Sequence, residues 1–285
     1  GAAVWSADGT QIAWYRATSA EPDWDILRAV VGSPVATREV ILEGDGAMFP
    51  LSFSPRKRSL LVGRYTSITS SERFLLELRG DDPALTQVDV GEDVAWVGGE
   101  MIDERRFIAI SDKGSEFKRL VRVNAKTGRL RVLDPDTKWN VEAFDVAPNR
   151  RRVAYAINAG GASELYVLNL RSRRVTRGPR IGMGVLTSLG FSPDGRKVGF
   201  GFSGATAPGD VWSFAVRSPQ VDRWTEGEVG GLDRDLFVSP DIIEVKSGTV
   251  SVPAFVYRPE GEGPHPVVVD IHGGPEAQER PYFSP

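Results

Sequence analysis

Short apolar runs, broken by Gly, Pro, Asp and Asn, recur through the first 225 residues of the chain. One unit, an apolar strand followed by a turn and a second strand, appears as "VWSADGTQIAWYR" (4–16), "LSFSPRKRSLLVGRY" (51–65), "FDVAPNRRRVAYAI" (144–157) and "LGFSPDGRKVGFGF" (189–202), with a weaker copy, "GGEMIDERRFIAIS" (98–111). The first apolar residue of the second strand recurs about every 46 residues, at Ile12, Leu60, Phe107, Val153 and Val198. An even period of this length indicates a repeat architecture.

Each copy continues into a third strand and often a fourth, as in "ELYVLNL" (164–170) followed by "RVTR" (174–177). Asp-Gly, Thr-Gly and Gly-Gly pairs supply the positive φ angles that tight hairpins need, and no helical periodicity is sustained before residue 225. A β-sandwich would explain short strands but not the even period. The pattern therefore predicts an all-β fold, a β-propeller of four-stranded blades over residues 1–226.

The repeat stops after residue 226. A connector containing Gly and Pro is expected at 227–241, and then a hairpin around Ser247-Gly248 with strands near 242–246 and 250–257. The continuous apolar run at 267–271, which ends at His272, is typical of a strand buried on both faces of an α/β sheet. Residues 242–285 are therefore predicted to open a second domain of a different class.

Composition places the chain among ordinary globular proteins. Hydrophobic residues make up 41% and charged residues 26% of its 285 residues, and no apolar run is long enough to span a bilayer. The net charge of −3 provides no field that would recruit nucleic acid or an anionic membrane. Two basic clusters, at 150–152 and 171–177, are interpreted as solvated turns and strand edges.

Cofactor chemistry has little support in the sequence. The chain has no Cys and two His, which argues against a disulfide, a thiolate nucleophile or a zinc site, and no glycine motif for a phosphate or dinucleotide follows a suitable strand. We expect no cofactor and no metal.

The first residues lack an initiator Met and a signal peptide, so we expect a trimmed N-terminus and leave open a cytoplasmic location, or a periplasmic or secreted one after signal removal. The oligomeric state also stays open.

A family resemblance appears most specifically at the C-terminal end. "FVYRPEGEGPHPVVVDIHGGPEAQERPYFSP" (255–285), with the "SPDG" turn (192–195), "SDKGSEFKRLVRVNAKTG" (111–128) and "GGLDRDLFVSP" (230–240), resembles the prolyl oligopeptidase family of serine peptidases, especially its acylaminoacyl and dipeptidyl peptidase-like branches. The resemblance implies a propeller that caps an α/β-hydrolase domain with a Ser, Asp, His triad. Because propellers of this family commonly have seven or eight blades, we expect the chain to begin partway round one.

The triad itself is not found in the sequence. No Ser has the G-x-S-x-G context of a hydrolase nucleophile: Ser163, Ser192 and Ser203 each have a Gly two residues before but none two residues after. His265, between two prolines, is expected to be solvated, and His272 to be structural. The 285 residues alone are therefore predicted to be inactive, with the nucleophile, acid and base outside this chain.

The family resemblance implies one active-site role within this chain, at Gly274. The backbone N–H of Gly274 is the candidate donor to the oxyanion formed in acyl transfer, because a glycine lets the backbone approach the substrate. The alternative is that Gly273-Gly274-Pro275 is only a tight turn.

The leading hypothesis is the propeller and first hydrolase strands of a serine peptidase that cleaves short or unfolded peptides through an acyl-enzyme. Its expected partners are peptide substrates and the rest of its own catalytic domain, and its propeller restricts access. Two alternatives stay open: a stand-alone propeller that binds a protein partner, and an esterase or acyl-peptide hydrolase on the same scaffold. The sequence does not distinguish between endopeptidase, dipeptidyl peptidase and acylaminoacyl peptidase specificity.

Overall fold

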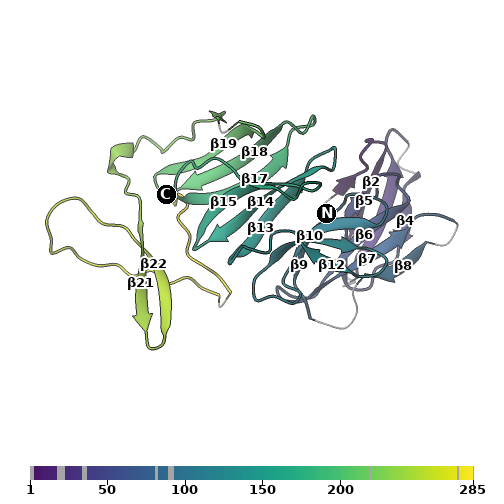
Figure 1. The fold of residues 1–285 in the computed structure, drawn as a ribbon, viewed down its shortest axis with the longest axis horizontal. Coiled ribbons are helices and arrows are strands. Elements are labelled where there is room, and N and C mark those ends of the chain that lie inside the picture. Colours follow the sequence, from purple (N-terminus) through teal and green to yellow (C-terminus); the bar gives the residue numbers. More distant parts are fainter. Residues whose placement is uncertain are drawn as a thin grey trace. The chain divides into compact units, whose positions relative to one another are not determined.

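A computed structural model describes residues 3–17, 23–33, 37–80, 83–88, 93–218, 220–274 and 276–284. Strands dominate these residues, and a short 3-10 helix, η2 (Arg234–Leu236), precedes the last hairpin (Figure 1). The chain divides into two compact units, residues 1–141 and 142–285, called here the N-terminal and C-terminal units.

Three four-stranded sheets form in the first part of the chain. The first contains β1 (Ala3–Trp5), β2 (Gln11–Arg16), β3 (Asp25–Val30) and β4 (Glu39–Leu42). The second contains β5 (Ala47–Phe53), β6 (Ser59–Tyr65), β7 (Ser71–Glu77) and β8 (Ala84–Gln87). The third contains β9 (Trp96–Met101), β10 (Arg106–Ser111), β11 (Arg119–Asn124) and β12 (Leu130–Val132).

Two further four-stranded sheets and a hairpin follow. The fourth sheet contains β13 (Asn140–Val146), β14 (Arg152–Ala159), β15 (Ala162–Asn169) and β16 (Val175–Arg177). The fifth contains β17 (Gly184–Phe191), β18 (Lys197–Gly204), β19 (Ala207–Ala215) and β20 (Val221–Arg223). The hairpin pairs β21 (Asp241–Ser247) with β22 (Val250–Val256).

The strand order confirms the sequence repeat. In every sheet the strands lie side by side in chain order, as an antiparallel meander. The five repeat markers all fall on the second strand of their sheet, namely Ile12 on β2, Leu60 on β6, Phe107 on β10, Val153 on β14 and Val198 on β18. The all-β expectation of five four-stranded units is therefore correct.

Strand β6 shows why the second strands are rich in apolar residues. Successive side chains of a strand point to opposite faces of its sheet. Accordingly, Leu60 and Val62 pack in one buried cluster with Ile26 of the first sheet, while Leu61 packs in another with Phe107 of the third. The sheets thus stack face to face, and a central strand needs apolar residues on both faces.

The fourth and fifth sheets pack in the same way. Ala154 of β14 and Val167 of β15 lie in one cluster with Phe200 of β18 and Phe214 of β19. The Phe200 and Phe214 rings meet nearly edge to face, with centroids 6.1 Å apart. This packing fixes the two sheets that receive the C-terminal end of the chain.

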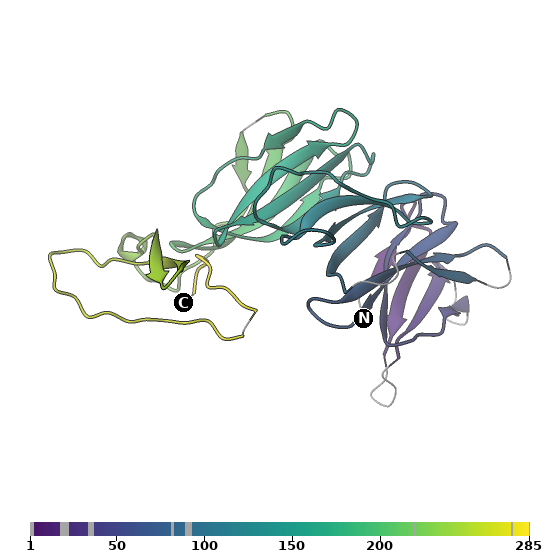
Figure 2. The ribbon, with the colours of Figure 1, turned by 60° about the horizontal axis from the view of Figure 1, so that its bottom comes forward.

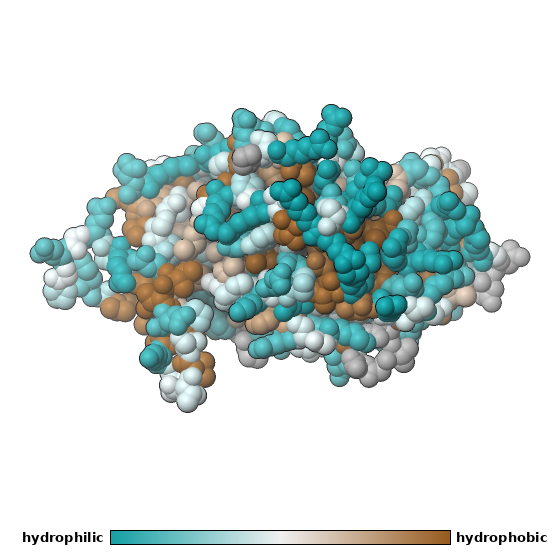
Figure 3. All heavy atoms as spheres, viewed as in Figure 1, coloured by the Kyte–Doolittle hydropathy of each residue, from teal (hydrophilic) through white to brown (hydrophobic). Residues whose placement is uncertain are grey.

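The expected strand at 267–271 is wrong, whereas the hairpin before it is confirmed at β21 and β22. Val267, Val268, Val269 and Ile271 form no strand and are between 75% and 92% exposed. A strand needs a neighbour for its N–H and C=O groups, and no described strand lies beside this run. Apolar side chains also remain exposed around the β21–β22 hairpin (Figure 3).

Candidate functional site

The glycine pair lies on a long loop after β22. Figures 1 and 2 show the yellow chain leaving the hairpin, running out as a loop and returning to the sheets of the C-terminal unit. Gly274 has a φ of 135°, and a β-carbon there would lie 2.9 Å from the backbone nitrogen of Glu276. Only glycine fits this conformation and this close approach. Pro275, the third residue of the expected turn, lies outside the described residues.

The residues after the glycine pair bind the fourth and fifth sheets. This C-terminal segment, residues 276–284, uses Arg280 as its main contact. The Arg280 Nε donates to the Gly161 carbonyl at 2.8 Å, its Nη1 to Glu142 Oε2 at 2.7 Å, and its Nη2 to Ser163 Oγ at 3.1 Å. One guanidinium therefore contacts β13, β15 and the turn that precedes β15.

Two contacts on either side of Arg280 extend the attachment. The Asn158 side-chain amide donates to Gln278 Oε1 at 2.7 Å, and the backbone N–H of Phe283 donates to Ser203 Oγ at 3.1 Å. The Phe283 ring also meets Phe237 edge to face, with centroids 5.4 Å apart. The segment is thus held at both ends as well as in its middle.

The turn between β14 and β15 is shaped to receive this segment. Gly160 and Gly161 have φ angles of 64° and 98°, which suits a two-residue hairpin turn. A β-carbon on Gly161 would lie 2.7 Å from the Phe255 ring of β22, so the close approach also requires glycine. The Gly-Gly pair therefore serves both the hairpin and the docking of the chain that follows.

The Arg280 site is partly shielded from water. The side chains of Arg280 and Glu142 are each 19% exposed. Ser163 completes the network, because its hydroxyl donates to Glu142 Oε1 and accepts from the backbone N–H of Leu186 at 2.9 Å. The positive charge of Arg280 is thus balanced by the carboxylate of Glu142 on β13.

The three serines that come nearest to a nucleophile motif have structural roles. Ser163 belongs to the Arg280 network, Ser203 accepts from Phe283, and Ser192 donates to Asp194 Oδ1 at 2.6 Å within a turn. Throughout the described ranges, no imidazole hydrogen-bonds any of these hydroxyls. Among the described residues, none of these three hydroxyls is therefore paired with a histidine that could act as its general base.

Both histidines lie in the exposed loop. His265 Nε2 is 3.3 Å from the Gly261 carbonyl, and His272 Nδ1 is 2.9 Å from the Gly273 carbonyl, so each ring bonds only local backbone. In the part of the chain that the structure describes, no three His, Cys, Asp or Glu side chains gather as metal ligands. Nor does any described helix have the length and apolar character needed to cross a membrane.

Sequence reasoning missed the residues that attach the segment. Arg280 stands in a polar stretch with no periodicity, and Glu142 looks like any outward-facing residue of a strand. The two are 138 positions apart, so no local pattern joins them. The Gly160-Gly161 pair is the one local signal at this site, and by itself it predicts only a hairpin turn.

No family model matches the chain. Its five four-stranded antiparallel sheets are consistent with the propeller blades of prolyl oligopeptidase-type structures. A puromycin-hydrolysing peptidase from Mycobacterium tuberculosis superposes with a TM-score of 0.73 at 16% identity, over 91% of this chain and 44% of that one. Prolyl oligopeptidase B from Galerina marginata gives 0.73 at 13% identity, over 90% and 38%.

The sequence comparison gives the family relationship. A prolyl oligopeptidase from Omphalotus olearius is 25% identical in a 246-residue alignment, and the match covers 76% of this chain and 33% of the relative. The chain is therefore related to the prolyl oligopeptidase family, as its sequence resemblance predicts. It spans about a third of the length of that relative and less than half of the solved structures.

Proposed function

We propose that the chain is the propeller portion and the opening of the catalytic domain of a serine peptidase that cleaves short or unfolded peptides through an acyl-enzyme. The relationship to a prolyl oligopeptidase over 76% of the chain carries this proposal. Residues 1–226 would be propeller blades, part of a propeller with seven, 227–241 a connector, and 242–285 the first part of an α/β-hydrolase domain. The propeller would restrict the active site to peptides that can pass it.

Gly274 has the proposed catalytic role in this chain. Acyl transfer places negative charge on the substrate carbonyl oxygen, and a fixed backbone N–H stabilises that charge without reorganisation. Two observations support Gly274 as the donor: it is exposed, and its N–H has no acceptor among the described residues. Attachment of the C-terminal segment through Arg280 would limit the motion of the loop and so help to position this donor.

The rest of the proposed active site would lie beyond residue 285. The nucleophilic Ser would attack the peptide carbonyl, and a His, oriented by an Asp, would remove its proton and then protonate the leaving amine. The exposed apolar run at 267–271 fits this proposal, because strands of a further domain would give it neighbours on both sides.

Reading the coding sequence past Pro285 and expressing its product tests the proposal. We expect a further G-x-S-x-G motif followed by Asp and His, labelling of that Ser by a fluorophosphonate, and cleavage of peptide anilides. A stop codon soon after Pro285, with a stable protein partner recovered by pull-down, would instead identify a stand-alone propeller.

Two further measurements sharpen this test. A panel of internally quenched peptides, dipeptidyl anilides, acylated amino-acid anilides and simple esters distinguishes the peptidase specificities from an esterase or acyl-peptide hydrolase. The 285-residue chain alone serves as the control. Hydrolysis by this chain that a serine-directed phosphonate blocks would contradict the placement of the nucleophile beyond it.

A further inference from the structure

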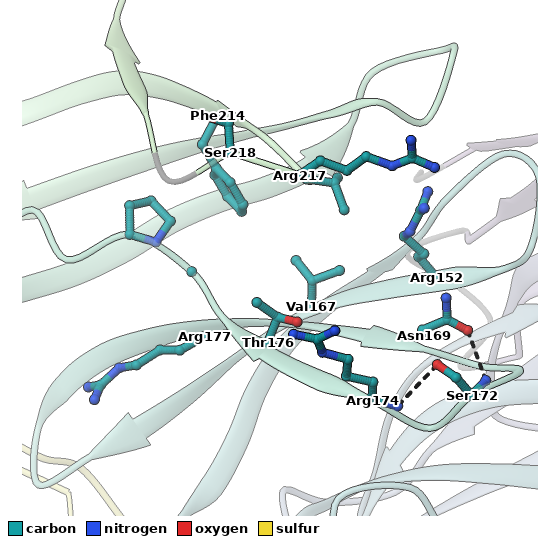
Figure 4. A pocket seen from close by; sticks show the side chains of 13 residues that line it. Arg152, Val167, Asn169, Ser172, Arg174, Thr176, Arg177, Phe214, Arg217 and Ser218 are labelled. Atoms are coloured by element: carbon teal, nitrogen blue, oxygen red, sulfur yellow. Dashed lines mark hydrogen bonds between the residues drawn. The ribbon is translucent and has the colours of Figure 1, made fainter.

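A cavity with a volume of about 460 Å³ opens between the fourth and fifth sheets. Its apolar floor includes Val167 and Phe214, which are buried, and its rim carries Arg152, Arg174 and Arg217. Figure 4 shows Arg152 and Arg217 on the same side of the cavity. An adjoining cavity of about 570 Å³ shares Arg152, Val216 and Arg217 with this one, so the two cavities lie side by side, and together they are called here the hollow.

The three arginines come from separate parts of the chain. Arg152 begins β14, Arg174 directly precedes β16, and Arg217 lies in the turn after β19. The basic clusters at 150–152 and 171–177, interpreted from the sequence as solvated turns and strand edges, therefore contribute to one site together with the turn after β19. The packing of the fourth sheet on the fifth produces this concentration of charge.

These three guanidinium groups have no carboxylate partner among the described residues. Their neighbours differ: Arg177 is paired with Glu164, and Arg196 lies 3.9 Å from Asp194, the one acidic side chain lining the adjoining cavity. Grouped guanidinium groups without acidic partners repel each other and attract anions, and each presents a fork of N–H donors suited to phosphate or carboxylate.

Neutral donors complete the lining. The side-chain oxygen of Asn169 accepts from the backbone N–H groups of Arg171 and Ser172, both at 3.0 Å, so its amide nitrogen remains available as a donor. The Thr176 hydroxyl also lines the cavity. A volume of several hundred Å³ is typical of small-molecule sites, so the hollow accepts a ligand larger than a single ion.

We propose that this hollow binds a small polyanion, a molecule that carries two or more phosphate or carboxylate groups. Its charged groups bind Arg152, Arg174 and Arg217, while its carbon skeleton or bridging atoms lie over Val167 and Phe214. The proposal does not depend on peptidase activity, because every residue involved lies in the fourth and fifth sheets or in the turns that join their strands.

Isothermal titration calorimetry of the chain at low ionic strength tests the proposal, with pyrophosphate as the phosphate probe and citrate as the carboxylate probe. We expect saturable binding of at least one probe, weakened by added salt because the groups are solvent-accessible. Binding of pyrophosphate alone assigns a phosphate-bearing ligand, binding of citrate alone assigns a polycarboxylate, and either result supports the site.

Charge-matched variants separate this site from general attraction of anions. Arg174→Gln and Arg217→Gln should each lower the affinity about tenfold or more. Arg171→Gln removes the same charge from an exposed side chain in the same turn that does not line the cavity, and it should change the affinity little. Thermal unfolding checks that all three variants are folded. Absence of saturable binding, unchanged affinity in the first two variants, or an equal loss in Arg171→Gln would overturn the proposal.

Discussion

Replacing Arg280 by Met should release the C-terminal segment from the sheets. The change removes one ion pair and two hydrogen bonds while keeping much of the side-chain volume. Exposed ion pairs contribute about 0–1 kcal/mol, and loss of one partner of a buried pair costs about 3–5 kcal/mol. With both side chains 19% exposed, we expect an intermediate loss of about 2 kcal/mol.

Amide hydrogen exchange provides the local measurement. Protection should fall in residues 276–284 and in the 158–163 turn, while the centre of β18 stays protected, because the contact fixes a peripheral segment rather than the core. Urea unfolding of Arg280→Met, Glu142→Gln and the double variant should give a coupling energy of about 1–2 kcal/mol.

A more exposed ion pair in the same unit serves as the control. Arg258 lies 3.5 Å from Asp241, with side chains 62% and 70% exposed, so Arg258→Met should change stability by about 0–1 kcal/mol. Unchanged exchange in 276–284, or a coupling energy near zero, would refute the reasoning that Arg280 holds the segment.

Three further predictions concern the sheets. Phe107→Ala should lower the free energy of unfolding by about 3–5 kcal/mol in urea, since Phe107 is fully buried; a loss below about 1 kcal/mol would contradict the face-to-face packing. Arg173→Gly should raise that free energy by up to about 1 kcal/mol, because Arg173 has a φ of 61°, and a clear destabilisation would count against this reasoning. Burial raises the pKa of Asp210, whereas hydrogen bonds from Arg223, Gly227 and Thr225 lower it. The hydrogen bonds have the larger effect together, so the pKa of Asp210 lies below its ordinary value. The ionised form is therefore favoured in the folded state, and its stabilisation, present above about pH 4, should be lost as the pH falls below that value. Urea unfolding at neutral and acidic pH should show a smaller acid effect in Asp210→Asn, and equal acid sensitivity in both proteins would contradict the assignment.

The local sequence pattern was sufficient to predict the strands of the sheets, but it was not sufficient to predict the structure of the apolar run at 267–271. Alternation and turn residues specify where strands begin and end, so the second strands and the β21–β22 hairpin could be predicted. However, a continuous apolar run does not by itself show that a strand is buried. In β6 it reflects sheets stacked on both faces, whereas Val267–Val269 and Ile271 have no described strand beside them and remain exposed.

By itself, the sequence determined the all-β class, the period of about 46 residues, the five four-stranded units and the positions of their tight turns, because these depend on residues close together in the chain. The tertiary structure alone decided which distant side chains meet. It brings Arg280 to Glu142 across 138 positions and gathers Arg152, Arg174 and Arg217 around one cavity. Such contacts depend on how sheets pack and how the chain returns to them, and neither leaves a periodic signal in the sequence.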